Sequence, residues 1–125
     1  MKIHQHFSLK HFNTFDIEQS AENFVAVTTQ SELKEALSLK QFDQKFILGG
    51  GSNLLLTQHI KGLCIHIALN GITVIQEEDN TVLVEAMAGE NWHDFVCWTL
   101  EQGYGGLENL SLIPGNVGTS PIQNI

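Results

Sequence analysis

The residues in this chain best suited to chemistry are three consecutive glycines, Gly49, Gly50 and Gly51, followed by Ser52 and Asn53. Glycine can adopt positive φ, which lets consecutive backbone N–H groups approach a bound anion. The two short polar side chains add further donors. The pattern predicts a backbone cradle for the pyrophosphate of a nucleotide or dinucleotide. A tight turn between two buried strands is the alternative that the same residues allow.

The residues after the glycines exclude two familiar phosphate-binding loops. A Walker A loop requires a Lys-Ser or Lys-Thr pair, which is absent. A dinucleotide fingerprint requires a glycine where Leu54 stands and a helix directly afterwards. The chain continues instead as Leu54-Leu55-Leu56-Thr57, a pattern typical of a short buried strand. A phosphate in this loop would therefore lie between strands, without a helix dipole.

The charge balance excludes one class of partner. Fourteen acidic residues oppose six lysines, arginine is absent, and the formal net charge is −8. Nucleic-acid binding is disfavoured, because clustered Lys and Arg supply most phosphate contacts.

The sequence shows no membrane-spanning or secretory segment. No apolar run approaches the roughly 18 residues of a membrane span, and the first residues lack the apolar region of a secretory signal. We therefore expect a cytoplasmic protein with no membrane partner.

Cysteines and histidines give no metal-binding pattern. Cys64 and Cys97 lie in a strand pattern and a helix pattern without a CxxC motif, so we expect reduced, buried thiols. The six histidines form no HExxH motif or Cys/His cluster. We expect no metal site, and a frayed N-terminus around His4 and His6.

The first half of the chain is predicted to be a small α/β lobe ending near Leu69. A capping box of Thr29 and Glu32 predicts the start of a helix between two strands, which would make residues 24–48 one βαβ unit. Residues 1–10 show no periodicity, and residues 11–17 favour an extended segment. The predicted strands are Phe24–Val27, Lys45–Leu48, Leu54–Leu56 and Leu63–Ile67.

The second half predicts a hairpin followed by a helix. Residues 72–76 and 81–86 are typical of strands and flank an acidic, solvated tip. Asn91 is expected to cap a helix that runs to about Gln102 and is terminated by Gly103. The expected buried stripe of this helix consists of Trp92, Phe95, Val96, Thr99 and Leu100.

The C-terminal stretch, residues 105–125, is the second stretch with a chemical pattern. Glycines and prolines recur at close intervals with small hydroxyl residues between them, which suits a backbone wrapped around a flat or anionic group. A linker is the alternative, but the interleaved Leu, Ile and Val residues are too apolar for a solvated linker.

Several motifs in a fixed order resemble one family. Asn13-Thr14-Phe15 is followed by Ile-Leu-Gly-Gly-Gly-Ser-Asn, Ala-Gly-Glu-Asn-Trp, Gly-Leu-Glu-Asn-Leu and finally Ile-Pro-Gly-Asn-Val-Gly-Thr-Ser-Pro-Ile-Gln-Asn-Ile. This order resembles the N-terminal part of the UDP-N-acetylenolpyruvoylglucosamine reductase family over nearly the whole chain. The resemblance implies an α+β, FAD-binding fold of the vanillyl-alcohol-oxidase (PCMH) type, with two small α/β lobes.

The resemblance also implies a cofactor and a reaction. In the family, NADPH reduces FAD, and the flavin then reduces the enolpyruvyl double bond of a nucleotide sugar, giving UDP-N-acetylmuramate for peptidoglycan. The loop at residues 49–53 corresponds to the family's pyrophosphate site, and residues 114–125 correspond to a segment along the flavin. The implied cofactor-binding residues are Gly49, Gly50, Gly51, Ser52, Asn53, Leu54, Pro114, Gly115, Gly118, Thr119, Ser120 and Ile122.

No catalytic residue is assigned, because the family's catalytic serine, arginine and glutamate have no counterpart before Ile125. We expect residues 1–69 to form the first FAD-binding lobe and residues 70–125 to begin a second, incomplete one. An unpaired sheet edge in that second lobe would favour self-association. Another FAD-dependent oxidoreductase of the same superfamily, or a non-catalytic nucleotide-binding module, remains an alternative.

Overall fold

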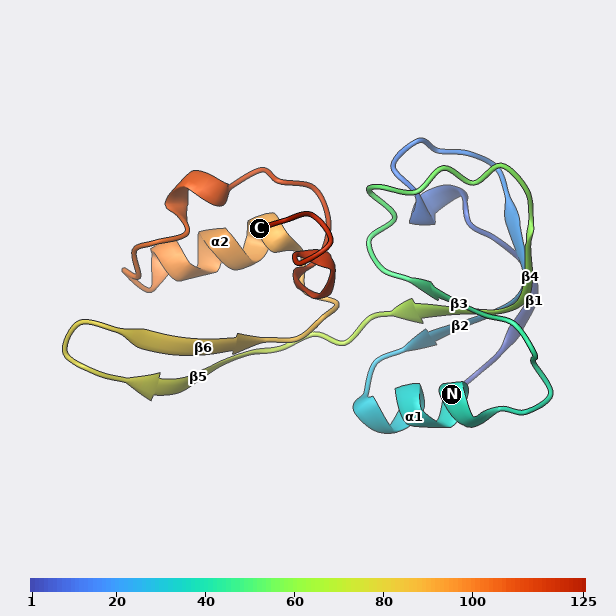
Figure 1. The fold of residues 1–125 in the computed structure, drawn as a ribbon, viewed down its shortest axis with the longest axis horizontal. Coiled ribbons are helices and arrows are strands. Elements are labelled where there is room, and N and C mark those ends of the chain that lie inside the picture. Colours follow the sequence, from blue (N-terminus) through green and yellow to red (C-terminus); the bar gives the residue numbers. More distant parts are fainter. The chain divides into compact units, whose positions relative to one another are not determined.

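A computed structural model describes all residues, 1–125, and the chain divides into two compact units (Figure 1). Unit 1 comprises Met1–Leu69, and unit 2 comprises Asn70–Ile125. Each unit combines a β-sheet with one α-helix, so the predicted α+β class is confirmed. No helix in the structure is both long and apolar enough to cross a membrane.

Unit 1 contains a four-stranded mixed sheet in the order β1-β2-β4-β3. Strand β2 (Ser20–Val27) and strand β3 (Lys45–Leu48) both run parallel to β4 (Ile60–Ile67). The predicted strands at 24–27 and 45–48 are therefore confirmed. The βαβ prediction needs one correction, because β4 lies between β2 and β3, and its apolar residues 63–65 fill the centre of the sheet.

Three local predictions in unit 1 are wrong. The first residues are not frayed: β1 (His4–Ser8) pairs antiparallel with β2 and supplies main-chain hydrogen bonds that periodicity does not reveal. A 3₁₀ turn, η1 (Lys10–Phe12), replaces the expected extended segment. Residues 54–56 form no strand, because they lie in the loop that connects β3 to β4.

The helix of unit 1, α1 (Gln30–Ser38), begins where the sequence predicts. The Thr29 side chain accepts a hydrogen bond from the Glu32 N–H at 3.1 Å. The carboxylate of Glu32 also accepts from the N–H of Thr28 at 2.8 Å and from its hydroxyl at 2.9 Å. These bonds lower the pKa of Glu32 and extend the cap by one residue.

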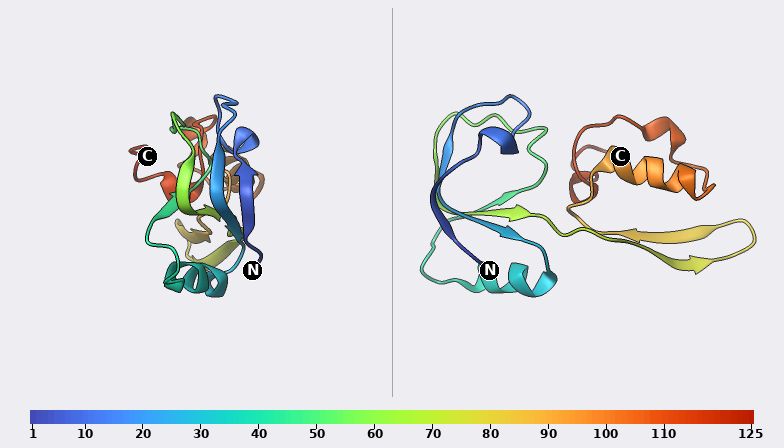
Figure 2. Two further views of the ribbon diagram at one scale, coloured as in Figure 1. Left: turned by 90° about the vertical axis from the view of Figure 1, so that its right-hand side faces the viewer. Right: turned by 180° about the vertical axis from the view of Figure 1, so that it is seen from behind.

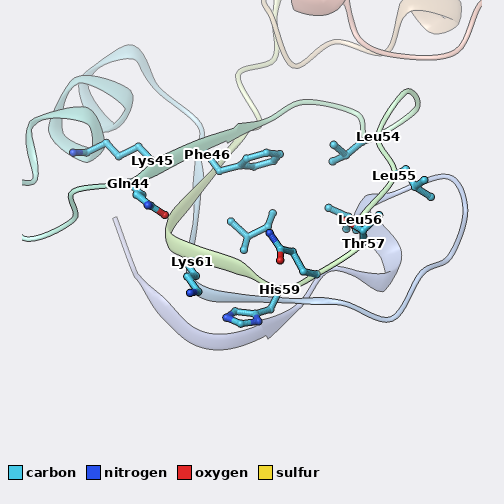
Figure 3. A pocket seen from close by; sticks show the side chains of 11 residues that line it. Gln44, Lys45, Phe46, Leu54, Leu55, Leu56, Thr57, His59 and Lys61 are labelled. Carbon is cyan, nitrogen blue, oxygen red and sulfur yellow. The ribbon is translucent and has the colours of Figure 1, made fainter.

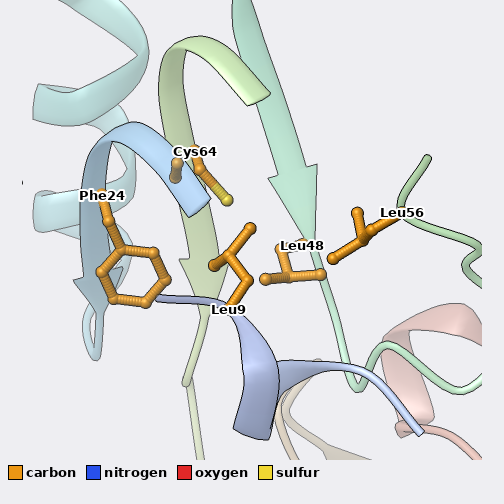
Figure 4. Packing of buried hydrophobic residues seen from close by; sticks show 6 residues of the cluster. Leu9, Phe24, Leu48, Leu56 and Cys64 are labelled. Carbon is orange, nitrogen blue, oxygen red and sulfur yellow. The ribbon is translucent and has the colours of Figure 1, made fainter. Parts of the chain in front are cut away.

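The core of unit 1 fixes both ends of the glycine-rich loop (Figure 4). Leu48, directly before Gly49, and Leu56, three residues after Asn53, both point into this core. Because both flanks are buried, the loop between them is held at two fixed points. The buried members of the cluster are Leu9, Ala21, Phe24, Leu48, Leu56 and Cys64.

Unit 2 is a hairpin covered by a helix. Strands β5 (Ile72–Glu77) and β6 (Val82–Ala86) pair antiparallel, and α2 (Trp92–Glu101) lies along one face of them (Figures 1 and 2). The Asn91 side chain caps α2 by accepting from the Asp94 N–H at 3.1 Å, as predicted. Gly103 follows the helix with φ +77°, a conformation typical of a helix end.

The apolar side of α2 packs on the hairpin. Trp92, Phe95 and Val96 are buried against Ile72, Val84 and Ala86. Thr99 is also buried, but Leu100 is 48% exposed, so its place in the predicted stripe is wrong. Two 3₁₀ turns, η2 (Glu108–Leu110) and η3 (Val117–Thr119), follow α2.

Candidate functional site

The predicted glycine cradle lies directly after β3, at the carboxyl end of two parallel strands. Only Gly51 has positive φ, at +68°; Gly49 and Gly50 do not adopt the left-handed conformation. The backbone N–H groups of residues 50–53 donate no hydrogen bond within the chain. The loop thus presents consecutive free donors.

Gly51 is tightly packed against residues 12–14. A Cβ atom placed on Gly51 would lie 2.0 Å from the carbonyl oxygen of Phe12. The carbonyl oxygen of Gly51 accepts two hydrogen bonds from Thr14, from its N–H at 3.2 Å and from its hydroxyl at 3.0 Å. Glycine at this position is therefore required by the fold.

Asn13 organises the segment that contacts Gly51. Its side chain is only 6% exposed, and its amide nitrogen donates to the carbonyl oxygens of Leu9 at 2.8 Å and Ile17 at 3.1 Å. Its amide oxygen accepts from the Ile17 N–H at 3.0 Å. One buried amide therefore closes the loop of residues 9–17.

His66, on β4, lies beneath the start of the glycine loop. Its Nδ1 atom is 3.3 Å from the carbonyl oxygen of Leu48; because a carbonyl can only accept, we assign the proton to Nδ1. The ring also packs edge-to-face on Phe12. Burial lowers the pKa of His66, and hydrogen bonding to the carbonyls of Leu48 and Gly49 acts in the opposite direction. A neutral imidazole therefore supports the end of β3.

The sequence on either side of the loop carries no acidic residue. No acidic residue occurs between Asp43 and Glu77, whereas Lys45 and Lys61 do occur in that interval. All six lysines belong to unit 1, together with six acidic residues. The formal charge of −8 therefore comes entirely from unit 2, with its eight acidic residues. Unit 1 by itself carries no net formal charge.

The predicted cofactor segment of unit 2 pairs with the residues before α2. The Val117 N–H donates to the carbonyl of Glu90 at 2.8 Å, and the Gly118 N–H donates to that of Ala88 at 3.0 Å. The Trp92 N–H donates to the carbonyl of Gly115 at 2.9 Å. Gly115 has φ +116°, and a Cβ on Gly118 would lie 2.6 Å from the Cβ of Ala88. The positive φ accounts for glycine at Gly115, and close packing within unit 2 accounts for it at Gly118.

The remaining predicted residues of this segment lie around η3. The Thr119 hydroxyl donates to the carbonyl of Asn116 at 2.9 Å and accepts from the Asn116 N–H at 3.3 Å. The Ser120 N–H donates to the carbonyl of Val117. Pro114 and Ile122 are both exposed, Ile122 at 78%. Every available backbone N–H from Asn116 to Ile122 is thus used inside unit 2.

Two side chains of α2 anchor the segment that precedes this turn. The indole N–H of Trp92 donates to the carbonyl of Leu110 at 2.8 Å. The Nδ1 atom of His93 accepts from the N–H of Leu112 at 3.2 Å and lies 3.0 Å from the Ser111 hydroxyl. The sequence did not reveal these anchors, because α2 and its partners are about 18 residues apart.

A cavity of about 330 Å³ lies beside the loop that follows the glycines (Figure 3). Phe46, Leu54 and Leu56 face the cavity, whereas Lys45 extends away and donates to the carbonyl of Phe42 at 2.9 Å. Leu54 is the one predicted cofactor-binding residue among those that line it.

The thiols and histidines form no site. No group of three or more His, Cys, Asp and Glu side chains could hold a metal ion. Both cysteines are free thiols; Cys64 is buried, and burial raises its pKa to about 12. Cys97 is only half-buried, so the expectation of two buried thiols is wrong for this residue.

Comparison with known proteins agrees with this geometry. The family model described as an FAD binding domain matches residues 21–125. The UDP-N-acetylenolpyruvoylglucosamine reductase of Flavobacterium johnsoniae is 58% identical over 125 residues, which cover 100% of this chain and 37% of that protein. The enzyme of the same name from Pseudomonas fluorescens is 49% identical and is likewise matched by the whole chain, over 38% of its length.

A solved structure gives the same result. The crystal structure of UDP-N-acetylenolpyruvylglucosamine reductase from Thermus caldophilus matches with a TM-score of 0.66 and 25% identity, over 95% of this chain and 40% of that one. The chain therefore spans less than half the length of the relatives it matches. The expected resemblance is confirmed: the chain belongs to the FAD-binding domain family and matches the N-terminal FAD-binding region of the UDP-N-acetylenolpyruvoylglucosamine reductases.

Proposed function

We propose that the chain binds the pyrophosphate of FAD through the loop Gly49, Gly50, Gly51, Ser52 and Asn53, within unit 1 as the first FAD-binding lobe. The observation that carries this proposal is the run of free backbone N–H groups at residues 50–53 on a loop fixed at both flanks. A hydrogen bond to a charged group contributes about 1.5–3 kcal/mol, so several converging donors can hold a pyrophosphate without a lysine or arginine. The absence of acidic residues from the sequence between Asp43 and Glu77 supports the same assignment.

We propose a different kind of contact for unit 2, as the start of the second lobe. Because the backbone N–H groups of residues 116–122 are already used, cofactor contacts there would come from the side chains and carbonyls of Pro114, Ser120 and Ile122 and from the free N–H of Gly115. Gly118 and Thr119 would act by shaping the turn.

For the whole protein, we propose an NADPH-dependent reductase that converts the enolpyruvyl ether of UDP-N-acetylglucosamine to UDP-N-acetylmuramate in cytoplasmic peptidoglycan synthesis, and so serves cell shape and division. Bound FAD would supply the hydride chemistry. The residues of this chain would hold and orient the FAD, and none of them is assigned a catalytic role. The names of the relatives support this proposal.

A titration of the purified chain with FAD, followed by flavin fluorescence and absorbance, tests the binding proposal. Gly50 is exposed and lacks positive φ, so Gly50→Val should block the cradle while leaving the fold intact. Gly105→Val is the matched control, because a Cβ at Gly105 meets nothing within 4 Å. We expect saturable binding to the wild type and the control, and loss of binding in Gly50→Val.

Equal binding by Gly50→Val would contradict the assignment to residues 49–53. No binding by the folded wild-type chain would contradict the proposal that these residues suffice. The same pair of substitutions in a protein of the relatives' full length would then show whether the cradle is used there.

We also propose that unit 2 self-associates through its hairpin. Strands β5 and β6 pair only with each other, and Ile75 and Leu83 are 55% and 58% exposed. Sedimentation velocity should show concentration-dependent association that Leu83→Lys reduces. A monomeric wild-type chain with one sharp, cooperative unfolding transition would contradict this proposal.

A further inference from the structure

The segment of residues 9–17, named here the brace, holds the glycine loop by a contact that no phosphate-binding role explains. Thr14 lies 37 positions before Gly51 and directs both its N–H and its hydroxyl at one atom, the carbonyl oxygen of Gly51. The carbonyl oxygen of Phe12 closes the other side of Gly51, where it leaves no room for a Cβ atom. Gly51 is therefore fixed on two sides by the brace.

The hydrogen bonds that fix the carbonyl of Gly51 also fix the direction of the next backbone donor, the N–H of Ser52. The peptide bond between Gly51 and Ser52 is trans, so its C=O and N–H groups point in opposite directions. Because the carbonyl points at Thr14, the N–H of Ser52 must point away from the brace. This N–H donates to no group in the chain, so it is held outward and available.

The brace is itself a rigid element. The amide of Asn13 is buried and bonded to Leu9 and Ile17, and Leu9 belongs to the core of unit 1. The amide nitrogen of Asn13 also donates to the carbonyl oxygen of Lys10 at 3.4 Å. Thr14 is the next residue in the chain, so its position is set by that of Asn13. The orientation of the loop is thus transmitted from the core through Asn13 and Thr14 to Gly51.

We infer that Asn13 and Thr14 are positioning residues for the FAD pyrophosphate, acting through the carbonyl of Gly51 to aim the N–H groups of the glycine loop. This inference rests on the proposed function of that loop. A loop ordered before binding loses less conformational entropy when it binds, so the two residues raise affinity without touching the ligand. The side chain of Asn13 holds the brace together, and Thr14 donates the hydrogen bonds to the carbonyl of Gly51.

Thr14→Val tests this inference, because it removes the hydroxyl and preserves the shape and the N–H of the residue. We expect a dissociation constant for FAD that is weaker by about three- to tenfold, as the loss of one hydrogen bond predicts. Thr14→Ser restores the hydroxyl and should restore most of the affinity. Thr57→Val is the matched control, since Thr57 is exposed, lies in the same unit and makes no hydrogen bond through its hydroxyl.

A second measurement separates the inference from the proposed function. The ¹H–¹⁵N heteronuclear NOEs of residues 50–53 report the order of the loop without any ligand. We expect lower values in Thr14→Val and unchanged values in Thr14→Ser and Thr57→Val. Thermal unfolding monitored by far-ultraviolet circular dichroism would confirm that all variants are folded.

The outcomes differ for the two claims. Wild-type affinity and wild-type NOEs in Thr14→Val would overturn the inference and leave FAD binding intact. A wild-type chain that binds no FAD would overturn the proposed function, and the NOE comparison would still decide whether Thr14 holds the loop. Weaker binding that Thr14→Ser fails to restore would overturn the role of the hydroxyl.

Discussion

The two glycine-rich stretches of this chain use glycine in different ways. In unit 1, the loop at residues 49–53 keeps four consecutive N–H groups free, and Gly51 alone is constrained by packing and positive φ. In unit 2, residues 116–122 donate every available N–H to neighbouring carbonyls or to the hydroxyl of Thr119. The two stretches resemble each other in composition, but only the first has a backbone able to cradle an anion.

The charge distribution separates the same two regions. Unit 1 carries equal numbers of lysines and acidic residues, whereas unit 2 has eight acidic residues and no basic one. An anionic cofactor therefore meets no net repulsion from unit 1, while the formal charge of unit 2 opposes it. Glycine content alone therefore does not distinguish the two stretches, whereas their free donors and the net charges of their units do.

The largest expected effect comes from Gly51→Ala. The new Cβ would meet the carbonyl oxygen of Phe12 at 2.0 Å, and alanine disfavours φ +68°. We expect unit 1 to lose about 2–4 kcal/mol of stability. Hydrogen–deuterium exchange resolved by peptide measures the units separately, and only peptides of residues 1–69 should exchange faster. Wild-type exchange in these peptides would show that the packing of Gly51 is not required.

A smaller effect is expected from Gly118→Ala in unit 2. Its φ is not positive, but the Cβ would meet the Cβ of Ala88 at 2.6 Å and its carbonyl oxygen at 2.9 Å. We expect a loss of about 1–3 kcal/mol. Both tryptophans belong to unit 2, so urea unfolding followed by tryptophan fluorescence reports on this unit. Gly105→Ala is the control, and equal stability of the two variants would refute the role of close packing at Gly118.

The smallest effect concerns His66 and pH. Burial lowers its pKa in the folded state below the ordinary value of 6.5, so the unfolded chain binds the proton more readily. The stabilising contribution is complete above pH 6.5 and is lost as the pH falls through the lowered pKa. The protection factors of β3 and β4 peptides, which are corrected for the pH dependence of intrinsic exchange, should therefore fall on acidification in the wild type, and His66→Gln should reduce this dependence. An identical pH dependence in both proteins would exclude His66 as its source.

Local sequence signals predicted the elements whose hydrogen bonds are local. The helix caps at Thr29 and Asn91 link residues three positions apart, and the two strands of the hairpin at residues 72–86 are consecutive in the chain. Strand β1 could not be predicted, because its polar residues gain their structure from pairing with β2. Residues 54–56 were wrongly predicted as a strand because they are apolar. These leucines pack in the core or line the cavity and pair with no strand.

The candidate site shows the same division. The amino-acid sequence alone shows where a backbone without side chains could approach an anion, because only glycine lacks a Cβ atom. The order of the sequence motifs also indicates the family. The tertiary structure was needed to establish that residues 50–53 keep their N–H groups free and that residues 116–122 do not. It also placed Thr14 against Gly51, 37 residues away. Composition sets what a backbone can adopt, whereas its hydrogen-bond partners are set by contacts between segments distant in the chain.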